Sequence, residues 1–248
     1  MKFPDHFSGV ATSYATYRPQ YPASLFAWLA SQCRRNDLAW DCACGSGQAT
    51  LSLAKHFELV IGTDASPTQL AAGKGDETTR FVVAAAQQAP IAEGSVDLVT
   101  VAQALHWFTG EVFFSEVRRV ARPGCVFAAW TYGMPHIISE NMERVVHEFI
   151  DGPLGPYWPP EIRMVLDGYA DLDLPFEELE APPFEMRVEW TREEFLGFVR
   201  TWSAVGRYVE ERGADPVSKL DADLERASRN DTDFLSVSYR LELRVGRL

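Results

Sequence analysis

A turn of small residues follows a short apolar segment near residue 40 and is the first place where the chain could bind a ligand. Residues 40–48 read WDCACGSGQ, with Ala43, Gly45 and Gly47 at alternate positions. Small residues let a backbone pass close to a ligand that lies across the end of a strand, and Asp41 could orient the turn. A dinucleotide, a phosphate group or an adenosine cofactor could occupy such a turn.

Two of these ligands fit the turn poorly. A dinucleotide fingerprint needs Gly or Ala three residues after its second glycine, and this chain has Thr50 there. A phosphate loop needs Gly-Lys followed by Ser or Thr, and the turn lacks that combination. An NAD-dependent oxidoreductase is therefore the least favoured enzyme class. The ligand of the turn has to be inferred with the help of residues elsewhere in the chain.

Asp64 supplies part of that support, because it ends the next apolar segment, LVIGTD at residues 59–64. A carboxylate offers two acceptors at the spacing of two vicinal ribose hydroxyls. The alternative is that Asp64 caps a helix that begins near Ser66 and Pro67. Together with the glycine turn, Asp64 favours ribose binding.

His106 and Trp107 follow a third apolar segment, VDLVTVA at residues 96–102. Ligands of parallel sheets bind outside the carboxyl ends of the strands, so both residues are candidates for a substrate pocket. His106 could act as a general base, because the ordinary pKa of histidine lies near working pH. The alternative is a structural histidine that makes one hydrogen bond to the backbone, and a carboxylate substrate would need no base.

From residue 38 to 131, apolar segments alternate with helical or loop segments, and these elements position the residues described above. This alternation predicts an α/β fold with a mostly parallel sheet and helices on both faces. Two later segments, 184–190 and 237–245, are apolar at every second residue and predict an antiparallel edge. The apolar segments are LAWDC, LVIGTD, RFVVAA, VDLVTVA and CVFAAWT, and the expected helices cover 48–56, 67–72, 108–120 and a segment opened by a capping box at 191–194.

Residues 135–181 are rich in Pro, Gly and aromatic residues and predict a small inserted cap over the edge of the sheet. We expect Tyr157, Trp158 and Trp202 to surround a substrate, because an apolar lid excludes water. The alternative is that these aromatic side chains belong to the core. The whole chain is expected to form a single domain, divided into residues 1–36, 37–134, 135–181 and 182–248.

The composition of the chain argues against several classes of binding partner. The 248 residues are 46% hydrophobic with a formal net charge of −12, so the mean field of the protein repels nucleic acids and anionic membranes. The N-terminal residues MKFPDHFSG do not resemble a signal peptide, and no stretch approaches the roughly 20 apolar residues of a membrane span. The four cysteines lack the paired spacing of a zinc site. We expect a cytoplasmic protein without a metal ion.

A succession of motifs resembles the class I methyltransferases that use S-adenosylmethionine (SAM), specifically the methyltransferase type 11 domain. These motifs are WDCACGSGQ, IGTDASPTQL, AAAQQAP, SVDLVTVAQALHWF and RRVARPGCV. The segments AQALHWF and YATYRPQYP are similar to the small-molecule branch that contains trans-aconitate methyltransferases. The resemblance implies a Rossmann-like fold with seven strands, an antiparallel C-terminal hairpin and a small helical cap.

The resemblance also implies a set of cofactor contacts. The turn would run along the methionine part of SAM, with a backbone carbonyl near Ala43 receiving its ammonium group and Asp64 holding the ribose. An N-terminal helix would bring Arg18 or Tyr14 to the SAM carboxylate; alternatively that helix packs its aromatic residues on the sheet and Arg18 stays solvated. The remaining implied contacts are Ala86 and Gln87 at the adenine, and Ala65 and Ala102.

The implied activity is methyl transfer from SAM to a small molecule, with S-adenosylhomocysteine (SAH) as the second product. A carboxylic acid is the acceptor class that the resemblance suggests, and it would need help from cations such as Arg163 or Arg207. Ala43 stands where the family usually has Gly, and Ala85 and Gln87 stand where it often has acidic residues. These departures keep open a second reading, a non-catalytic protein that binds SAM or SAH.

Overall fold

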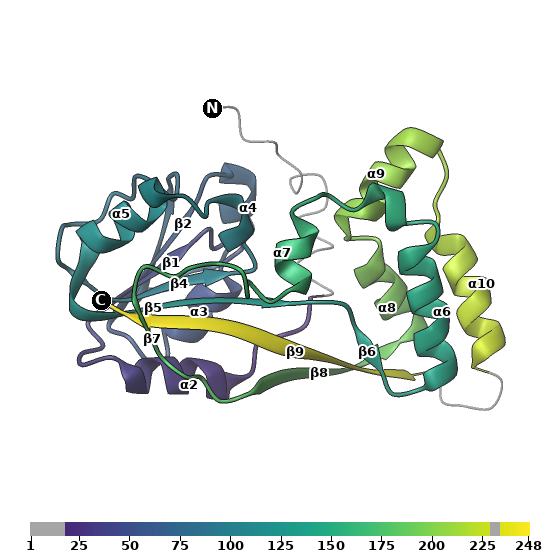
Figure 1. Cartoon of the computed structure of the whole chain (residues 1–248), viewed down its shortest axis with the longest axis horizontal. Coiled ribbons are helices and arrows are strands. Elements are labelled where there is room, and N and C mark those ends of the chain that lie inside the picture. Colours follow the sequence, from purple (N-terminus) through teal and green to yellow (C-terminus); the bar gives the residue numbers. More distant parts are fainter. Residues whose placement is uncertain (1–17, 229–233) are drawn as a thin grey trace.

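A sheet of nine strands organises the part of the chain that the computed structural model describes, residues 18–228 and 234–248. Five strands are parallel, in the order β3-β2-β1-β4-β5. They are β1 (Leu38–Cys42), β2 (Leu59–Asp64), β3 (Thr79–Val83), β4 (Val96–Ala102) and β5 (Ala121–Tyr132). The predicted parallel-dominated α/β fold is therefore confirmed (Figure 1).

Helices cover both faces of this parallel sheet. Side chains alternate between the faces along each strand, so the fully buried Trp130 joins a core with α2 and α3, whereas the fully buried Trp40 joins a core with α5. The helices are α2 (Ala23–Gln32), α3 (Gln48–Leu53), α4 (Pro67–Ala71) and α5 (Glu111–Val120). The helix expected around Tyr14 lies outside the described residues.

Strand β9 (Phe234–Arg247) extends the sheet beyond the parallel strands. Residues 241–247 pair antiparallel with β5, and residues 234–241 pair antiparallel with β8 (Phe184–Thr191). The short strands β6 (His136–Ile137) and β7 (Glu177–Glu178) also pair with β9. The antiparallel edge is confirmed, and the sheet has nine strands rather than seven because the long β9 accepts additional partners.

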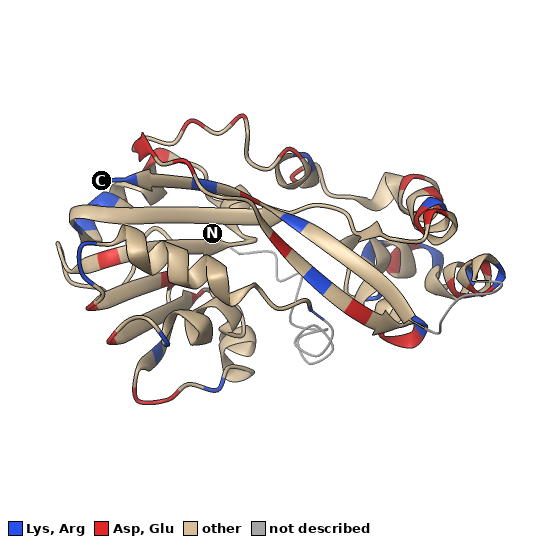
Figure 2. Cartoon of the chain, turned by 90° about the horizontal axis from the view of Figure 1, so that it is seen from below, with Lys and Arg blue, Asp and Glu red and all other residues tan. Residues whose placement is uncertain are grey.

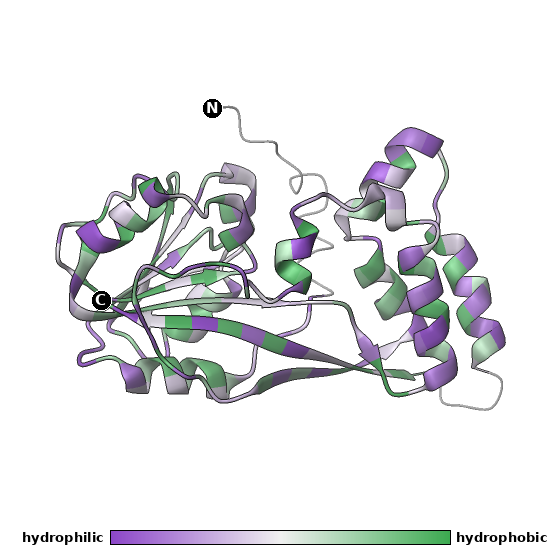
Figure 3. Cartoon of the chain, viewed as in Figure 1, coloured by the Kyte–Doolittle hydropathy of each residue, from purple (hydrophilic) through white to green (hydrophobic). Residues whose placement is uncertain are grey.

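The ribbon of β8 and β9 is amphipathic. Apolar and polar residues alternate along both strands (Figure 3), and acidic and basic side chains follow each other at many of the polar positions (Figure 2). Glu185 of β8, for example, lies opposite Arg240 of β9. Charged side chains on an exposed ribbon oppose its pairing with other strands, and the apolar side chains face the core.

A helical lobe lies at the far end of this ribbon (Figure 1). It contains α6 (Glu140–Asp151), α8 (Arg192–Val199), α9 (Ser203–Arg212) and α10 (Val217–Ala227), and α7 (Ile162–Leu166) lies between the lobe and the parallel sheet. The predicted capping box opens α8, with Thr191 and Glu194 bonding each other's backbone N–H groups. The cap is therefore built from residues 192–227 as well as from 135–181. Among the described residues, no helix is long and apolar enough to cross a membrane.

Candidate active site

A cavity of about 1020 Å³ lies at the carboxyl ends of the parallel strands and reaches across to the helical lobe. One side is formed by the segments that follow β1, β2, β3 and β4, and the other side by the 3-10 turn η2 (Leu105–Trp107), α7 and the start of α9. The volume lies at the upper end of the range for small-molecule sites. The cavity therefore has room for a cofactor and a second ligand.

The turn after β1 has the left-handed backbone that its small residues allow. Ala43, Gly45 and Gly47 have φ values of 54°, 56° and 87°. A Cβ on Gly47 would lie 2.5 Å from Cζ of Phe81, so only glycine fits there. Gly47 precedes α3 and lies behind the cavity wall, whereas Ala43 and Gly45 line the cavity. Ala43 adopts the left-handed conformation at a cost of about 1–2 kcal/mol.

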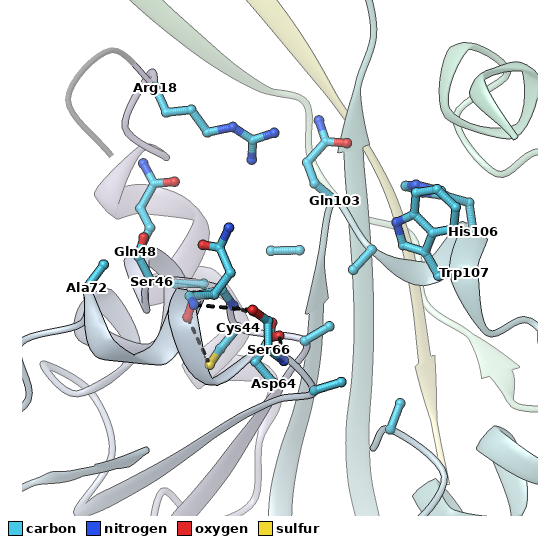
Figure 4. A pocket seen from close by; sticks show the side chains of 18 of the residues that line it. Arg18, Cys44, Ser46, Gln48, Asp64, Ser66, Ala72, Gln103, His106 and Trp107 are labelled. Atoms are coloured by element: carbon cyan, nitrogen blue, oxygen red, sulfur yellow. Dashed lines mark hydrogen bonds between the residues drawn. The ribbon is translucent and has the colours of Figure 1, made fainter. Parts of the chain in front are cut away.

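Asp64 fastens this turn to the end of β2. Its Oδ2 accepts a hydrogen bond from the backbone N–H of Gly45 at 2.9 Å, and its Oδ1 accepts one from Ser66 at 2.8 Å (Figure 4). The cap of α4 is Ser66, whose hydroxyl accepts from the N–H of Gln69 at 3.3 Å, so Asp64 does not cap this helix with its own side chain. Each carboxylate oxygen has two lone pairs, so Asp64 keeps acceptor capacity toward a ligand in the cavity.

Asp41 does not line the cavity, contrary to its prediction as a cofactor contact. It is fully buried beneath the turn, where its two oxygens accept hydrogen bonds from Thr50 at 2.6 Å and from Thr100 at 2.9 Å. Burial raises the pKa of Asp41 to about 6, against the effect of both hydrogen bonds. Asp41 therefore ties α3 and β4 together under the turn, and Thr50, which breaks the dinucleotide pattern, serves as its partner.

The remaining residues predicted to contact a cofactor line this half of the cavity. They are Arg18, Ala65, Ala86, Gln87 and Ala102. The side chain of Arg18 extends into the cavity toward Gln103 (Figure 4), with its guanidinium 5.8 Å from the ring centre of Tyr132. A guanidinium there can bind a carboxylate. Tyr14, its predicted companion, lies outside the described residues.

The opposite half of the cavity is aromatic and carries one histidine. His106 and Trp107 line it, with their ring centres 4.7 Å apart, and Phe108 and Trp202 complete the aromatic wall. Burial lowers the pKa of His106 to about 4, although the nearby Glu161 acts in the opposite direction. His106 is therefore neutral at pH 7, and Glu161 gives this half a negative charge.

Tyr157 and Trp158 were predicted to surround a substrate, but neither of them lines this cavity. The hydroxyl of Tyr157 donates to Glu211 at 3.1 Å, and the ring of Tyr157 packs edge-on against Tyr208. Trp158 donates its indole N–H to the carbonyl of Ile150 at 3.4 Å. Tyr157 belongs to the core that the helical lobe contributes to, and the partly buried Trp158 packs against that core. Arg163 and Arg207 do not line the cavity either.

The sequence analysis missed several polar residues at the strand ends. Gln103 follows β4 with φ 55° and lines the cavity, and its position directly after an apolar segment was the available signal. The other polar lining residues without a prediction are Gln20, Cys44, Ser46, Gln48, Ser52, Lys55, Ser66, Gln69, Lys74, Glu161, Thr201 and Ser203. Many of them belong to α3, α4 and the ends of α7 and α9, where a sequence does not show which face meets the cavity.

Comparison with known proteins identifies the family. Residues 40–129 match the model of a methyltransferase domain. A protein of Dictyostelium discoideum that is named as a methyltransferase is 32% identical over 244 residues, covering 96% of this chain and 93% of the relative. The chain belongs to the class I SAM-dependent methyltransferases.

Two further comparisons show how much of this methyltransferase is similar to known proteins. A Saccharomyces cerevisiae protein named as a SAM-dependent methyltransferase is 26% identical, with 82% of each chain covered. The solved structure of a type II methyltransferase from Anaeromyxobacter dehalogenans superposes with a TM-score of 0.86 and is 41% identical, covering 93% of this chain and 98% of that one. The helical lobe is thus part of a fold shared over nearly the whole chain, and the narrower resemblance to trans-aconitate methyltransferases stays a prediction.

Proposed function

We propose that this methyltransferase binds SAM along the strand ends and transfers its methyl group to a small molecule held against the aromatic wall. The observation that carries the proposal is the single cavity that joins the glycine turn and Asp64 to His106, Trp107 and Trp202. When bound, SAM supplies an electrophilic methyl group on a sulfonium. The product would be SAH.

The residues of the first half fit SAM. Asp64 offers carboxylate oxygens to the ribose hydroxyls, and Arg18 offers a guanidinium to the carboxylate of the methionine part. The small side chains of Ala65, Ala86 and Ala102 leave space for flat and apolar groups beside the strand ends. Recognition of adenine would rest on the backbone at Ala86 and the amide of Gln87, because no acidic side chain stands at these positions.

The residues of the second half fit a role in positioning rather than in covalent chemistry. The walls of Trp107, Phe108 and Trp202 exclude water and hold the acceptor close to the methyl group, which is the main requirement of an in-line transfer. A small molecule is favoured over a nucleic acid because the net charge is −12. We place the protein in the cytoplasm.

The test is transfer of labelled methyl from SAM to a panel of small hydroxyl, amine and carboxylic acid compounds, including aconitate. We expect label in at least one compound, and we expect Trp202→Ala to reduce that transfer while the affinity for SAM stays unchanged. Tight SAM binding without label in any compound would support the alternative, a non-catalytic SAM-binding or SAH-binding protein. The left-handed Ala43 is the feature that favours this alternative, because it departs from the usual glycine.

A further inference from the structure

The carboxylate of Glu161 lies in the acceptor half of the cavity. Glu161 directly precedes α7, and its side chain is exposed to solvent while it also lines the cavity. Within the part of the chain that the structure describes, no hydrogen bond or ion pair engages this carboxylate. Arg163, two residues further along, does not line the cavity. The carboxylate of Glu161 can therefore pair with a ligand in the acceptor half.

The basic side chains of the cavity do not balance this charge. Among residues 18–228 and 234–248, those that line the cavity are Arg18, Lys55 and Lys74. All three belong to the cofactor half, where Lys55 follows α3 and Lys74 follows α4. His106 adds no positive charge at pH 7, because burial lowers its pKa to about 4, although Glu161 acts to raise it. The acceptor half therefore has a negative charge at pH 7.

Aromatic side chains make up much of the same wall. Trp107, Phe108 and Trp202 line the acceptor half. The ring of Trp202 is held by Trp158 and Phe198 of the helical lobe, with ring centres 5.7 Å and 5.9 Å away. The face of an aromatic ring is negative and attracts cations, most strongly in tryptophan. Aromatic rings beside a carboxylate are the surroundings that suit an ammonium group.

An anionic group would bind poorly in these surroundings. It would lose water on entering an aromatic pocket and would meet the like charge of Glu161. Arg18 would not compensate, because in the proposed function it pairs with the carboxylate of SAM. The net charge of −12 acts in the same direction, since the mean field of the protein attracts cations and repels anions. The acceptor half therefore discriminates between ligands by their charge.

We infer that the acceptor carries a positively charged nitrogen group, and that Glu161 is the specificity-determining residue that binds this group beside Trp107 and Trp202. This inference rests on the proposed function, because it assigns the acceptor to the half of the cavity that SAM does not fill. It concerns the group by which the acceptor is held. The bond that forms to the methyl carbon and the carbon–sulfur bond that breaks are those of the proposed transfer.

The direct test is isothermal titration of the full chain, saturated with SAH, with probes of similar shape and different charge. At pH 7 2-phenylethylamine is a cation, 2-phenylethanol is neutral and 3-phenylpropionate is an anion. We expect the amine to bind about tenfold more tightly than the anion, with the alcohol between them. Glu161→Gln should reduce this preference about fivefold, and Glu161→Lys should abolish it.

Glu210→Gln is the matched control, because Glu210 is an exposed residue of α9 that does not line the cavity. This substitution makes the same change in net charge and should leave the preference for the amine unchanged. The absence of a preference for the amine in the wild type would overturn the inference. An equal preference in the wild type and Glu161→Gln would overturn the role of Glu161.

The titration needs no turnover, so it separates a failure of this inference from a failure of methyl transfer. SAM is itself a cation at sulfur, and Glu161→Gln should leave the affinities for SAM and SAH unchanged. A loss of affinity for SAM but not for SAH would assign Glu161 to the cofactor and overturn its role toward the acceptor. In the methyl-transfer assay, Glu161→Gln should lower kcat/KM for acceptors with an ammonium group about fivefold. Label confined to carboxylic acids would overturn the acceptor class.

Discussion

Replacement of Ala43 by glycine should stabilise this methyltransferase. Ala43 has φ 54°, a conformation that costs an L residue about 1–2 kcal/mol and costs glycine almost nothing. Glycine also increases the conformational entropy of the unfolded chain, which offsets about 0.4–1 kcal/mol of that gain. The net expectation is a gain of about 1 kcal/mol in the free energy of unfolding, or roughly 2–4 °C in Tm for a chain of this size.

Urea unfolding and calorimetry of Ala43→Gly measure this gain in the free energy of unfolding. A matched control is an alanine-to-glycine substitution that should lower the free energy of unfolding instead. Ala222 is exposed within α10, where the same substitution should cost about 0.5–1 kcal/mol. Opposite signs for the two variants would show that the left-handed backbone at residue 43 is the cause. A loss of stability in Ala43→Gly, or equal losses in both variants, would refute the reasoning.

Three further substitutions follow from the same region. Asp64→Ala should weaken SAM binding by about 1.5–3 kcal/mol in a calorimetric titration; unchanged affinity would limit Asp64 to holding the turn. Gly47→Ala should cost about 2–4 kcal/mol in urea unfolding, because a Cβ meets Phe81 at φ 87°, and a loss below about 0.5 kcal/mol would contradict this. Asp41 has a folded pKa of about 6, above its ordinary value, so its ionisation destabilises the fold as pH rises from about 4 to 6. The stability of Asp41→Asn relative to the wild type should therefore rise by about 3 kcal/mol from pH 4 to 7 in urea unfolding, and a difference that does not vary with pH would disprove it.

Much of the parallel sheet could be predicted because its signal is local. Strands β1, β2 and β4 have the same bounds as the apolar segments 38–42, 59–64 and 96–102, since buried parallel strands are continuously apolar. The helix expected at 108–120 begins only at Glu111, because Gly110 before it has an extended backbone and forms the N-cap. The full length of β9 and the helical lobe depend on pairing between distant segments, which a local pattern does not contain.

The residues of the candidate site also fall into two groups, those that a local sequence pattern predicts and those that depend on the tertiary structure. Asp64 could be placed because parallel strands bring their carboxyl ends to one edge, and Ala65, Ala86 and Ala102, which the family resemblance implied, line the same cavity. Asp41 ends up under the turn because strand alternation and its hydrogen bonds with two threonines direct it inward, and sequence spacing alone did not show this.

The aromatic residues show most clearly which contacts could not be predicted from the sequence. Tyr157 and Trp158 pack within the helical lobe, whereas Trp202 reaches the cavity, and the sequence around each residue did not show this difference. Tyr169 had no signal in the segment DGYADL, because its contact with His106 joins residues 63 positions apart. Tertiary packing decides such contacts.

Binding of SAM is the central claim, and isothermal titration of the full chain with SAM and with SAH tests it most directly. We expect one site with a dissociation constant in the micromolar range, near 8 kcal/mol of binding free energy. Binding should weaken strongly in Asp64→Ala. The absence of binding heat at millimolar SAM and SAH would contradict the claim.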